Sequence, residues 1–369
     1  MHRVPGDRQK LQDSTMNVDR RSGQVYLEST AIPSLSSSRG PAWVHETPFL
    51  PQGWEETSDA GPPSLKHAAM RQLLSDQRNL QPTLFAHVPW RIASYLWDCL
   101  GRSRKRTLHM WKLFATAYPE EFRHVSPYRR MKIEGPRLSL REYLGLVKSD
   151  SMGWRVVLTL AASHARVPEL VEISSIRNLA ALEIATPKHA QPVLDEAVSP
   201  LAALSDRIVR TWSELAAASG AFAHLRVLVL AQQTELSGLA LRYLRAFPSL
   251  QLIMVLDCPG LVPVAGVDAE ANGWEVVLGS EKPETLYECY RISLTDGTVL
   301  DGPVLDFQVG YQTGRALDNM RNMRQKPWTL FRRREKVEGR ERGPPAAKRA
   351  RVMKAGRGKD LGGLLREFL

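Results

Sequence analysis

Two short apolar stretches decide the fold: LRVLVL at residues 225–230 and LQLIMV at residues 250–255. Both follow the spacing L-x-x-L-x-L, and their large aliphatic residues are 25 positions apart. Alternate side chains of a short strand point to one core, and the apolar residues of a returning helix cover that core. The residues expected on this helix are Leu236, Leu239, Leu244 and Phe247. One unit cannot bury its own apolar face, so the period predicts stacked strand–helix units.

An earlier copy of the spacing is formed by Leu179, Leu182 and Ile184. It lies 46 residues before the copy at residue 225, instead of 25. We therefore expect an inserted loop of roughly 20 residues near 185–203, where three prolines favour a loop. A helix is predicted over 204–218, where the chain returns to the sheet.

This pattern resembles the leucine-rich repeat, whose units of about 20–29 residues consist of a strand and a helix. Counted from Leu250, Cys258 is in the ninth position, where that family places Asn or Cys. Gln233 and Pro187 stand there in the other two copies and depart from the pattern. The resemblance implies an α/β fold, with a short degenerate leucine-rich-repeat array over 174–262, an N-terminal helical cap and disordered termini. The alternative is an ordinary α/β domain in which two strand–helix pairs share a period.

Composition divides the rest of the chain into four parts: a mostly disordered region at 1–80, a helical segment at 81–173, a capping segment at 263–323, and a disordered basic tail with a terminal amphipathic motif at 324–369. Low apolar density in the first part cannot offset the entropy of ordering. The apolar residues Val156–Leu160 are expected to continue the helical segment. Trp274–Leu278 and Cys289–Leu294 are expected to be terminal strands of the capping segment.

The helical segment also resembles an F-box, a three-helix module that binds the adaptor of cullin ubiquitin ligases. The resemblance is carried by Pro89, Ile92, Leu96, Trp111 and Leu113. It implies a substrate receptor whose repeats hold the substrate and whose helices bind a cullin adaptor. The basic run from Arg102 to Arg106 departs from the module's pattern, and the alternative is a helical cap of the array. The whole chain also resembles filamentous-fungal proteins with degenerate repeats, which implies no function.

Charge is concentrated in two basic zones. Residues 324–359 contain 14 Lys or Arg and three acidic residues, so their net charge of +11 equals that of the whole chain. Residues 101–141 contain 11 basic and three acidic residues, interleaved with aromatic side chains. This interleaving suits nucleic-acid backbone contact with base stacking, and the alternative is a solvated face over a helical core. Nucleic-acid association through 101–141 and 324–359 is therefore a further hypothesis, and any such binding would be weak and salt-sensitive.

The basic tail contains a candidate nuclear localisation signal at 344–352, built on Lys348, Arg349 and Arg351. An extended segment next to prolines can place successive basic side chains in acidic pockets of an import receptor. A second cluster, Arg332, Arg333 and Arg334, begins 16 residues before Lys348, and the two clusters together suit a bipartite signal. The sequence thus predicts a nuclear protein.

The last residues carry an apolar stripe formed by Leu361, Leu364, Leu365 and Phe368. These positions are spaced i, i+3, i+4 and i+7, the spacing of an amphipathic helix. An isolated helix of this length is marginal in water. The segment is either a docking helix that folds into a partner's groove or a helix that packs back on its own chain.

Catalytic and ligand-binding signatures are absent from the sequence. It contains no nucleophile elbow, phosphate-binding loop or zinc-protease motif, so we predict no enzyme activity and no cofactor. The three cysteines are far apart and have no partner at zinc spacing, so no metal site is predicted. No apolar run is long enough to cross a membrane, so no membrane contact is expected. The sequence therefore predicts a non-catalytic nuclear protein–protein interaction scaffold that uses a repeat-like surface.

Overall fold

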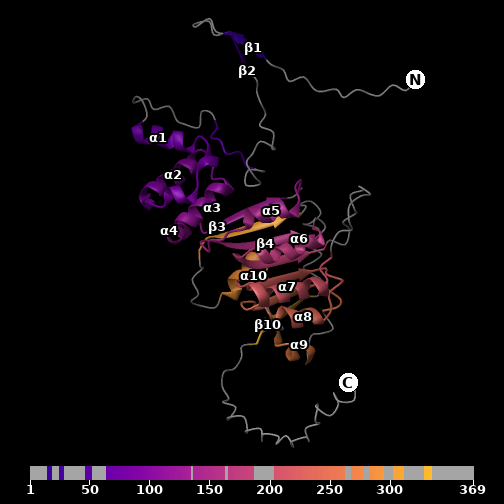
Figure 1. The fold of residues 1–369 in the computed structure, drawn as a ribbon. Helices are drawn as coiled ribbons and strands as arrows, with labels where there is room; N and C mark the ends of the chain where they lie inside the picture. The colour runs from indigo at the N-terminus through magenta and orange to yellow at the C-terminus, as the bar shows by residue number, and fades with distance from the viewer. Residues whose placement is uncertain are drawn as a thin grey trace, which may run out of the picture. The chain divides into compact units, whose positions relative to one another are not determined.

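The computed structural model of the 369-residue chain describes residues 15–18, 25–28, 46–51, 64–133, 136–162, 165–186, 203–261, 267–277, 283, 285–294, 302–310 and 328–334 (Figure 1). The chain divides into two units, 1–333 and 334–369, and all described residues except Arg334 belong to the first. Within the predicted disordered region 1–80, β1 (Thr15–Val18) and β2 (Val25–Glu28) pair antiparallel.

A helical module, defined here as residues 64–125, precedes the sheet. It contains α1 (Leu65–Leu74), two short 3-10 helices (Gln77–Asn79 and Pro82–Phe85), α2 (Trp90–Arg102), α3 (Leu108–Ala117) and α4 (Pro119–Val125). Aromatic rings fill its centre, with Trp97 4.8 Å from Phe122 and 5.3 Å from Phe114 between ring centroids. Pro119 begins α4 and ends α3, because its ring removes a helical hydrogen bond. The predicted helical segment therefore begins as expected.

Eight described strands form one sheet in the order β3-β9-β4-β5-β6-β7-β10-β8. Their bounds are β3 (Tyr128–Ile133), β4 (Arg155–Ala161), β5 (Leu179–Ala185), β6 (Val227–Ala231), β7 (Leu252–Leu256), β8 (Trp274–Val277), β9 (Val304–Val309) and β10 (Trp328–Arg333). The six strands from β3 to β7 are parallel, and β10 is antiparallel to both β7 and β8. The fold is thus mixed α/β around a single mixed sheet.

The leucine triplets lie side by side at the centre of this sheet. Leu228 on β6 is paired in register with Ile253 on β7 and with Leu182 on β5. Residues paired between β6 and β7 are 25 positions apart in the sequence. Residues paired between β4 and β5 are 24 positions apart from Val157 onward. The offset of 46 residues between β5 and β6 reflects the segment inserted between them.

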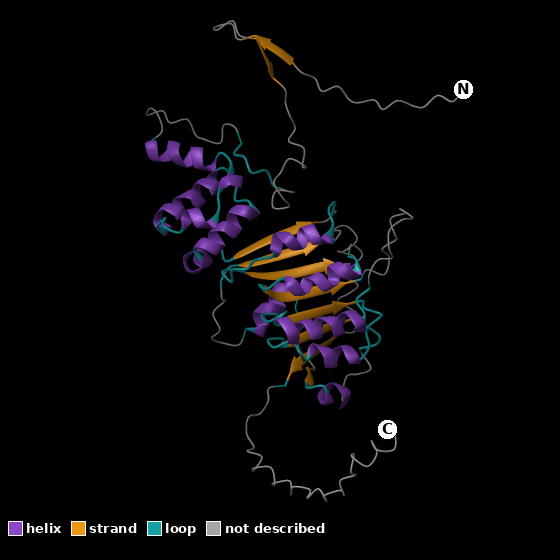
Figure 2. Ribbon diagram, in the orientation of Figure 1, coloured by secondary structure: helices purple, strands orange, loops and turns teal. Residues whose placement is uncertain are grey.

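The two sides of the sheet are covered differently. The remaining helices are α5 (Leu140–Val147), α6 (Val167–Glu172) with a 3-10 turn at Ile173–Ser175, α7 (Asp206–Ser219), α8 (Leu239–Leu244), α9 (Val267–Ala271) and α10 (Leu286–Ser293). Helices α5 to α8 lie side by side on one side, called here the helix face, where Leu158, Leu182 and Leu228 are buried (Figure 2). The other side, called the α10 face, buries Val157, Ala181 and Val229 in a second core with α10.

Three segments differ from the sequence-based expectations. Val156–Leu160, expected to be helical, lies in β4, because a short apolar run buried on both faces has no alternating pattern that separates strand from helix. Cys289–Leu294, expected to be a strand, falls mainly in α10, where Thr285 and Glu288 form a capping box. Trp328–Arg333, assigned to the disordered tail, forms β10 between β7 and β8.

The two described strands of residues 263–323 lie far apart in the sheet. Strand β8 lies at one edge, but β9 crosses to the far end and inserts between β3 and β4. Asp306 on β9 is paired in register with Arg130 on β3 and with Val157 on β4. The strand that pairs with the outer edge of β4 therefore comes from the C-terminal part of the chain.

Candidate protein-binding surfaces

A row of polar side chains joins the turns after β5, β6 and β7. The Gln233 amide Nε2 donates to the carbonyl oxygens of Ile184 at 3.0 Å and Ala231 at 2.8 Å. Its Oε1 accepts a hydrogen bond from Thr186 at 3.1 Å, and its backbone N–H donates to Cys258 Sγ at 3.2 Å. Gln233, the residue that departs from the repeat pattern, thus satisfies backbone groups in the turn as an Asn or Cys would.

The backbone repeats with the same period as the side chains. Gln232 and Asp257 have φ of 58° and 52°, and each directly precedes a residue of the polar row. Phe222 and Phe247, also 25 residues apart, stack with centroids 4.7 Å apart and planes at 7°. The segment around β7, from Phe247 to Asp257, therefore repeats the local geometry of the segment around β6, from Phe222 to Gln232.

The α10 face has an apolar centre covered by its own helix. Leu286, Cys289 and Tyr290 of α10 are buried in the same core as Ala181 and Ala185 of β5. The helix packs against β4, β5 and β6, and the small alanine side chains allow it to approach β5 closely. This part of the face is therefore occupied within the chain.

Beside α10, the α10 face ends in a polar and aromatic surface at β3 and β9. Tyr128 Oη donates to Asp306 Oδ2 at 2.6 Å, and the Tyr128 ring lies 4.6 Å from that of Tyr287 on α10. Arg130 Nε is 3.6 Å from Asp306 Oδ2, and its Nη2 donates to Gln308 Oε1 at 3.3 Å. Burial first, and then the bond to Asp306, raise the pKa of Tyr128, so the phenol stays protonated as a donor. We call Tyr128, Arg130, Tyr287, Asp306 and Gln308 the β3–β9 surface.

The F-box-like residues of the module divide into buried and exposed sets. Leu96, Trp111 and Leu113 are buried in the core. Pro89 is exposed at the N-cap of α2, and Ile92 in the first turns of α2 is 44% exposed. Leu84, just ahead of this helix, is 60% exposed. The start of α2 therefore presents apolar side chains to solvent.

The basic zone at 101–141 makes many contacts within the chain. The Arg106 guanidinium lies 4.8 Å above the Trp97 ring and donates to the Trp97 carbonyl. Arg102 lies over the Tyr95 ring, and Arg141 pairs with Glu172 at 2.7 Å. The aromatic residues of the zone that would stack on bases are largely buried, namely Trp111, Phe114, Tyr118 and Phe122. This arrangement favours the reading of a charged face over a helical core.

The predicted import and docking residues fall on different parts of the chain. Arg332 and Arg333 lie in β10, paired with strands on both sides. Arg333 Nη1 donates to the carbonyl oxygens of Phe247, Pro248 and Leu250, at 3.2 Å for Pro248 and 3.3 Å for Leu250. Arg334 directly follows β10 and is described. The other predicted residues lie outside the described part of the chain, namely Lys348, Arg349, Arg351, Leu361, Leu364, Leu365 and Phe368. The first half of a bipartite signal is thus part of the sheet.

Lys112 on α3 is a buried cation at the contact between the helical module and α5. Its Nζ donates to the Leu146 carbonyl oxygen at 2.5 Å, in the last turn of α5, and lies 5.6 Å from the Trp154 ring centroid. Burial lowers the pKa of Lys112 to about 8. His109, one turn earlier, donates from Nε2 to the Leu80 carbonyl oxygen at 3.0 Å, and burial lowers the pKa of His109.

The part of the chain that the structure describes offers little other ligand-binding chemistry. There, no group of three or more His, Cys, Asp or Glu side chains has the geometry of a metal site. Cys99, Cys258 and Cys289 are buried and form no disulfide. No described helix has the length and apolar character that crossing a membrane requires.

Comparisons with protein-family models, with curated proteins and with solved structures found no significant match to this chain. The candidate surfaces are therefore judged from their own geometry. The sequence did not identify Tyr128, Tyr287 and Asp306, because up to 178 residues separate contacting pairs. In the sequence, Gln233 stands out only as a departure from the Asn or Cys of the repeat pattern. A glutamine amide can nevertheless replace Asn where a turn carbonyl needs a donor.

Proposed function

We propose that this protein is a non-catalytic protein-interaction scaffold built on a short, degenerate leucine-rich-repeat-like array. The observation that carries the proposal is the repeated unit: strands offset by 24 or 25 residues, helices α5 to α8 on one face, and the Gln233–Cys258 row in the turns. Stacked units of this kind create extended surfaces that proteins use for binding.

The β3–β9 surface is the proposed contact region. It combines two tyrosines and an arginine beside a covered apolar core, and these residue types are enriched in binding hot spots. Arg130 is about half exposed at 54%, whereas its partner Asp306 is 5% exposed. A partner that reaches Arg130 and the tyrosine pair would therefore meet groups already held in place.

The test is affinity purification of full-length protein from its native cells in moderate salt, with mass spectrometry. We expect Arg130→Glu and Tyr287→Ala to remove a stoichiometric protein partner. Arg210→Glu is the matched control, because Arg210 is a similarly exposed arginine on α7, on the helix face. Loss of the partner with Arg210→Glu alone, or recovery of no stoichiometric protein, contradicts the proposal.

A second candidate function is an F-box-type substrate receptor, favoured by the exposed apolar side chains at the start of α2. We expect Ile92→Glu to remove a cullin adaptor from the purified complex. This substitution changes an exposed side chain and leaves the buried core residue Leu96 in place. Absence of the adaptor from the wild-type complex would exclude this candidate and leave the scaffold.

We also propose that the scaffold acts in the nucleus. The proposal now rests on Lys348, Arg349 and Arg351 alone, because Arg332 and Arg333 contribute to the sheet. A compact cluster next to two prolines suits recognition as an extended segment.

A further inference from the structure

A short segment ahead of the helical module lies on it in the manner of a bound peptide. Residues 46–51, called here the arm, alternate along their length. Glu46, Pro48 and Leu50 are partly or fully buried, whereas Thr47 and Phe49 are exposed. This alternation is that of an extended strand whose every second side chain enters a site.

The buried end of the arm is held by charge. The Glu46 carboxylate accepts hydrogen bonds from Arg129 Nη2 and from the backbone N–H of Leu108, the first residue of α3. Arg129 also donates through Nη1 to the Arg106 carbonyl at 2.5 Å. Its Nε is buried and has no hydrogen-bond partner among the described residues. An anion is therefore seated between a guanidinium and a helix N-terminus, where spare donor capacity remains.

The middle of the arm is held through its backbone and one ring. Gln77 N–H donates to the Pro48 carbonyl at 3.1 Å, and Phe49 forms a β-bridge with Asp76. The Arg78 guanidinium lies 4.8 Å above the Phe49 ring. Leu50 packs against the main core. These contacts involve the extended main chain and individual side chains, as in proteins that bind a peptide as an added strand.

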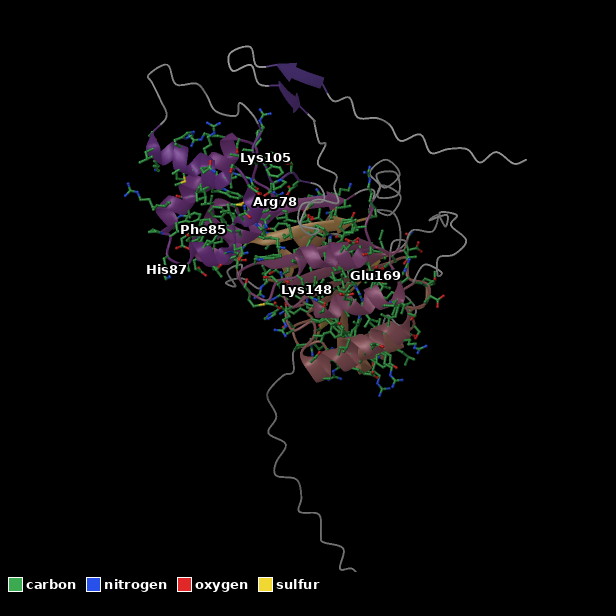
Figure 3. All side chains as sticks on the ribbon, turned by 45° about the horizontal axis from the view of Figure 1, so that its top comes forward. Arg78, Phe85, His87, Lys105, Lys148 and Glu169 are labelled. Atoms are coloured by element: carbon green, nitrogen blue, oxygen red, sulfur yellow. The ribbon has the colours of Figure 1, made fainter. Side chains whose placement is uncertain are left out.

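The residues of the module that contact the arm are bonded to each other independently of it. Gln77 is buried, its Nε2 donates to the Lys105 carbonyl at 3.2 Å, and its Oε1 accepts from Thr107 Oγ1 at 2.6 Å. Asp76 binds Arg78 at 2.8 Å. Arg78 and Lys105 accordingly lie on the same part of the module (Figure 3). The surface that the arm covers, called here the arm site, is thus formed by the module together with Arg129 of β3.

We propose that the arm site is a recognition site for extended acidic peptides of the pattern Glu-x-Pro-x-Leu, and that the arm occupies it as an internal competitor. The proposed ligand of this site is a segment of this pattern in a partner protein. The arm is tethered to the module, so it competes at the high effective concentration of an intramolecular ligand. A partner that presents a matching segment while bound elsewhere on the protein gains the same advantage and displaces the arm. This site uses Arg129, whose side chain points to the opposite side of β3 from Arg130, and does not depend on the scaffold proposal.

The test uses a fluorescein-labelled synthetic peptide of residues 43–52 and the full-length chain, with binding followed by fluorescence anisotropy. Glu46→Ala with Leu50→Ala in the chain weakens the arm, and we expect this double variant to bind the peptide at least about tenfold more tightly than the wild-type chain does. A peptide carrying Glu46→Ala is expected not to bind, and Arg129→Ala in the double variant is expected to abolish binding.

Phe49→Ala is a milder way to release the arm, because this ring is 39% exposed and outside the main core. It keeps the test valid if the double variant fails to fold, as judged by circular dichroism. Binding of the wild-type peptide by neither released variant overturns the proposal. Equal binding by wild-type and released chains overturns the internal competition.

Discussion

Gln233 is hydrogen-bonded to groups at the ends of three neighbouring strands, β5, β6 and β7. It bonds to the turn after β5, to its own turn and, through its backbone, to Cys258 after β7. All of these groups are buried, so each would otherwise lose its hydrogen bond to water without compensation. Gln233 is therefore a structural residue that connects the ends of β5, β6 and β7.

Replacing Gln233 with Ala is expected to lower the free energy of unfolding by about 2–3 kcal/mol, because buried carbonyl groups lose their donor. Urea denaturation measures the change. Gln72→Ala, at an exposed position on α1, is the matched control and should change stability by less than about 0.5 kcal/mol. Equal effects of the two substitutions would contradict the assigned role.

Lys112 predicts a pH dependence of stability. Its pKa is about 8 in the folded protein against 10.5 for an ordinary lysine, so between these values the unfolded chain binds more protons. The free energy of unfolding should therefore rise as pH increases from about 8 to 10.5, by up to about 3 kcal/mol from this group. Below pH 8 the burial cost is fully present.

The measurement for Lys112 is the difference in unfolding free energy between wild type and Lys112→Met across this pH range. Other lysines and tyrosines cancel in that difference. A difference that stays constant from pH 7 to 10.5 would show that Lys112 is not titrating in a buried site.

At the scale of the element, turns and helices place opposite demands on glycine. A Cβ built at Gly260, after β7, would lie 2.0 Å from the Leu236 carbonyl oxygen. A Cβ at Gly145, inside α5, would meet nothing within 4 Å. The first glycine permits close contact between successive units, and the second only loosens a helix.

We expect Gly260→Ala to destabilise the protein by about 2–3 kcal/mol, and Gly145→Ala to stabilise it by about 0.5–1 kcal/mol. Thermal unfolding of the two variants separates these signs directly. Stabilisation by both substitutions would mean that the turn after β7 relaxes freely.

The elements also show what can be predicted from sequence. The strand triplets and the helix over 204–218 were identifiable, because spacing within a unit is local, and α7 ends at Gly220 in the left-handed conformation (φ 68°). The Val156–Leu160 run was assigned to the wrong element because burial on both faces removes its periodicity. The position of β9, the β3–β9 surface and the position of the arm depend on contacts between distant residues, such as Glu46 with Arg129, which no local pattern records.

At the scale of the whole molecule, the C-terminal strands complete the sheet. Truncation after Arg334 is expected to leave the thermal unfolding midpoint within about 2 °C of that of the full chain, because β10 is retained. Truncation after residue 301 removes β9 and β10 and should abolish the cooperative transition. Calorimetry of both truncated chains makes the comparison, and cooperative unfolding of the shorter one would contradict the structure.

The nuclear proposal is tested with a fluorescently tagged full-length chain carrying Lys348→Ala, Arg349→Ala and Arg351→Ala. Nuclear accumulation should be lost because the import receptor loses its charge contacts. Arg332→Ala is the control in β10 and should leave localisation unchanged. Persistent accumulation of the triple variant would remove the basis of the nuclear assignment.

The position of β9 beside β4 has a consequence for synthesis of the protein. Strands β4 to β7 are translated before β9 and β10, the strands that pair with their outer edges. At about 5–20 residues per second, the interval between residues 256 and 310 lasts several seconds. During this time the nascent sheet presents two open edges, each able to pair with another chain. The protein is therefore expected to depend on chaperones during translation more than after its release.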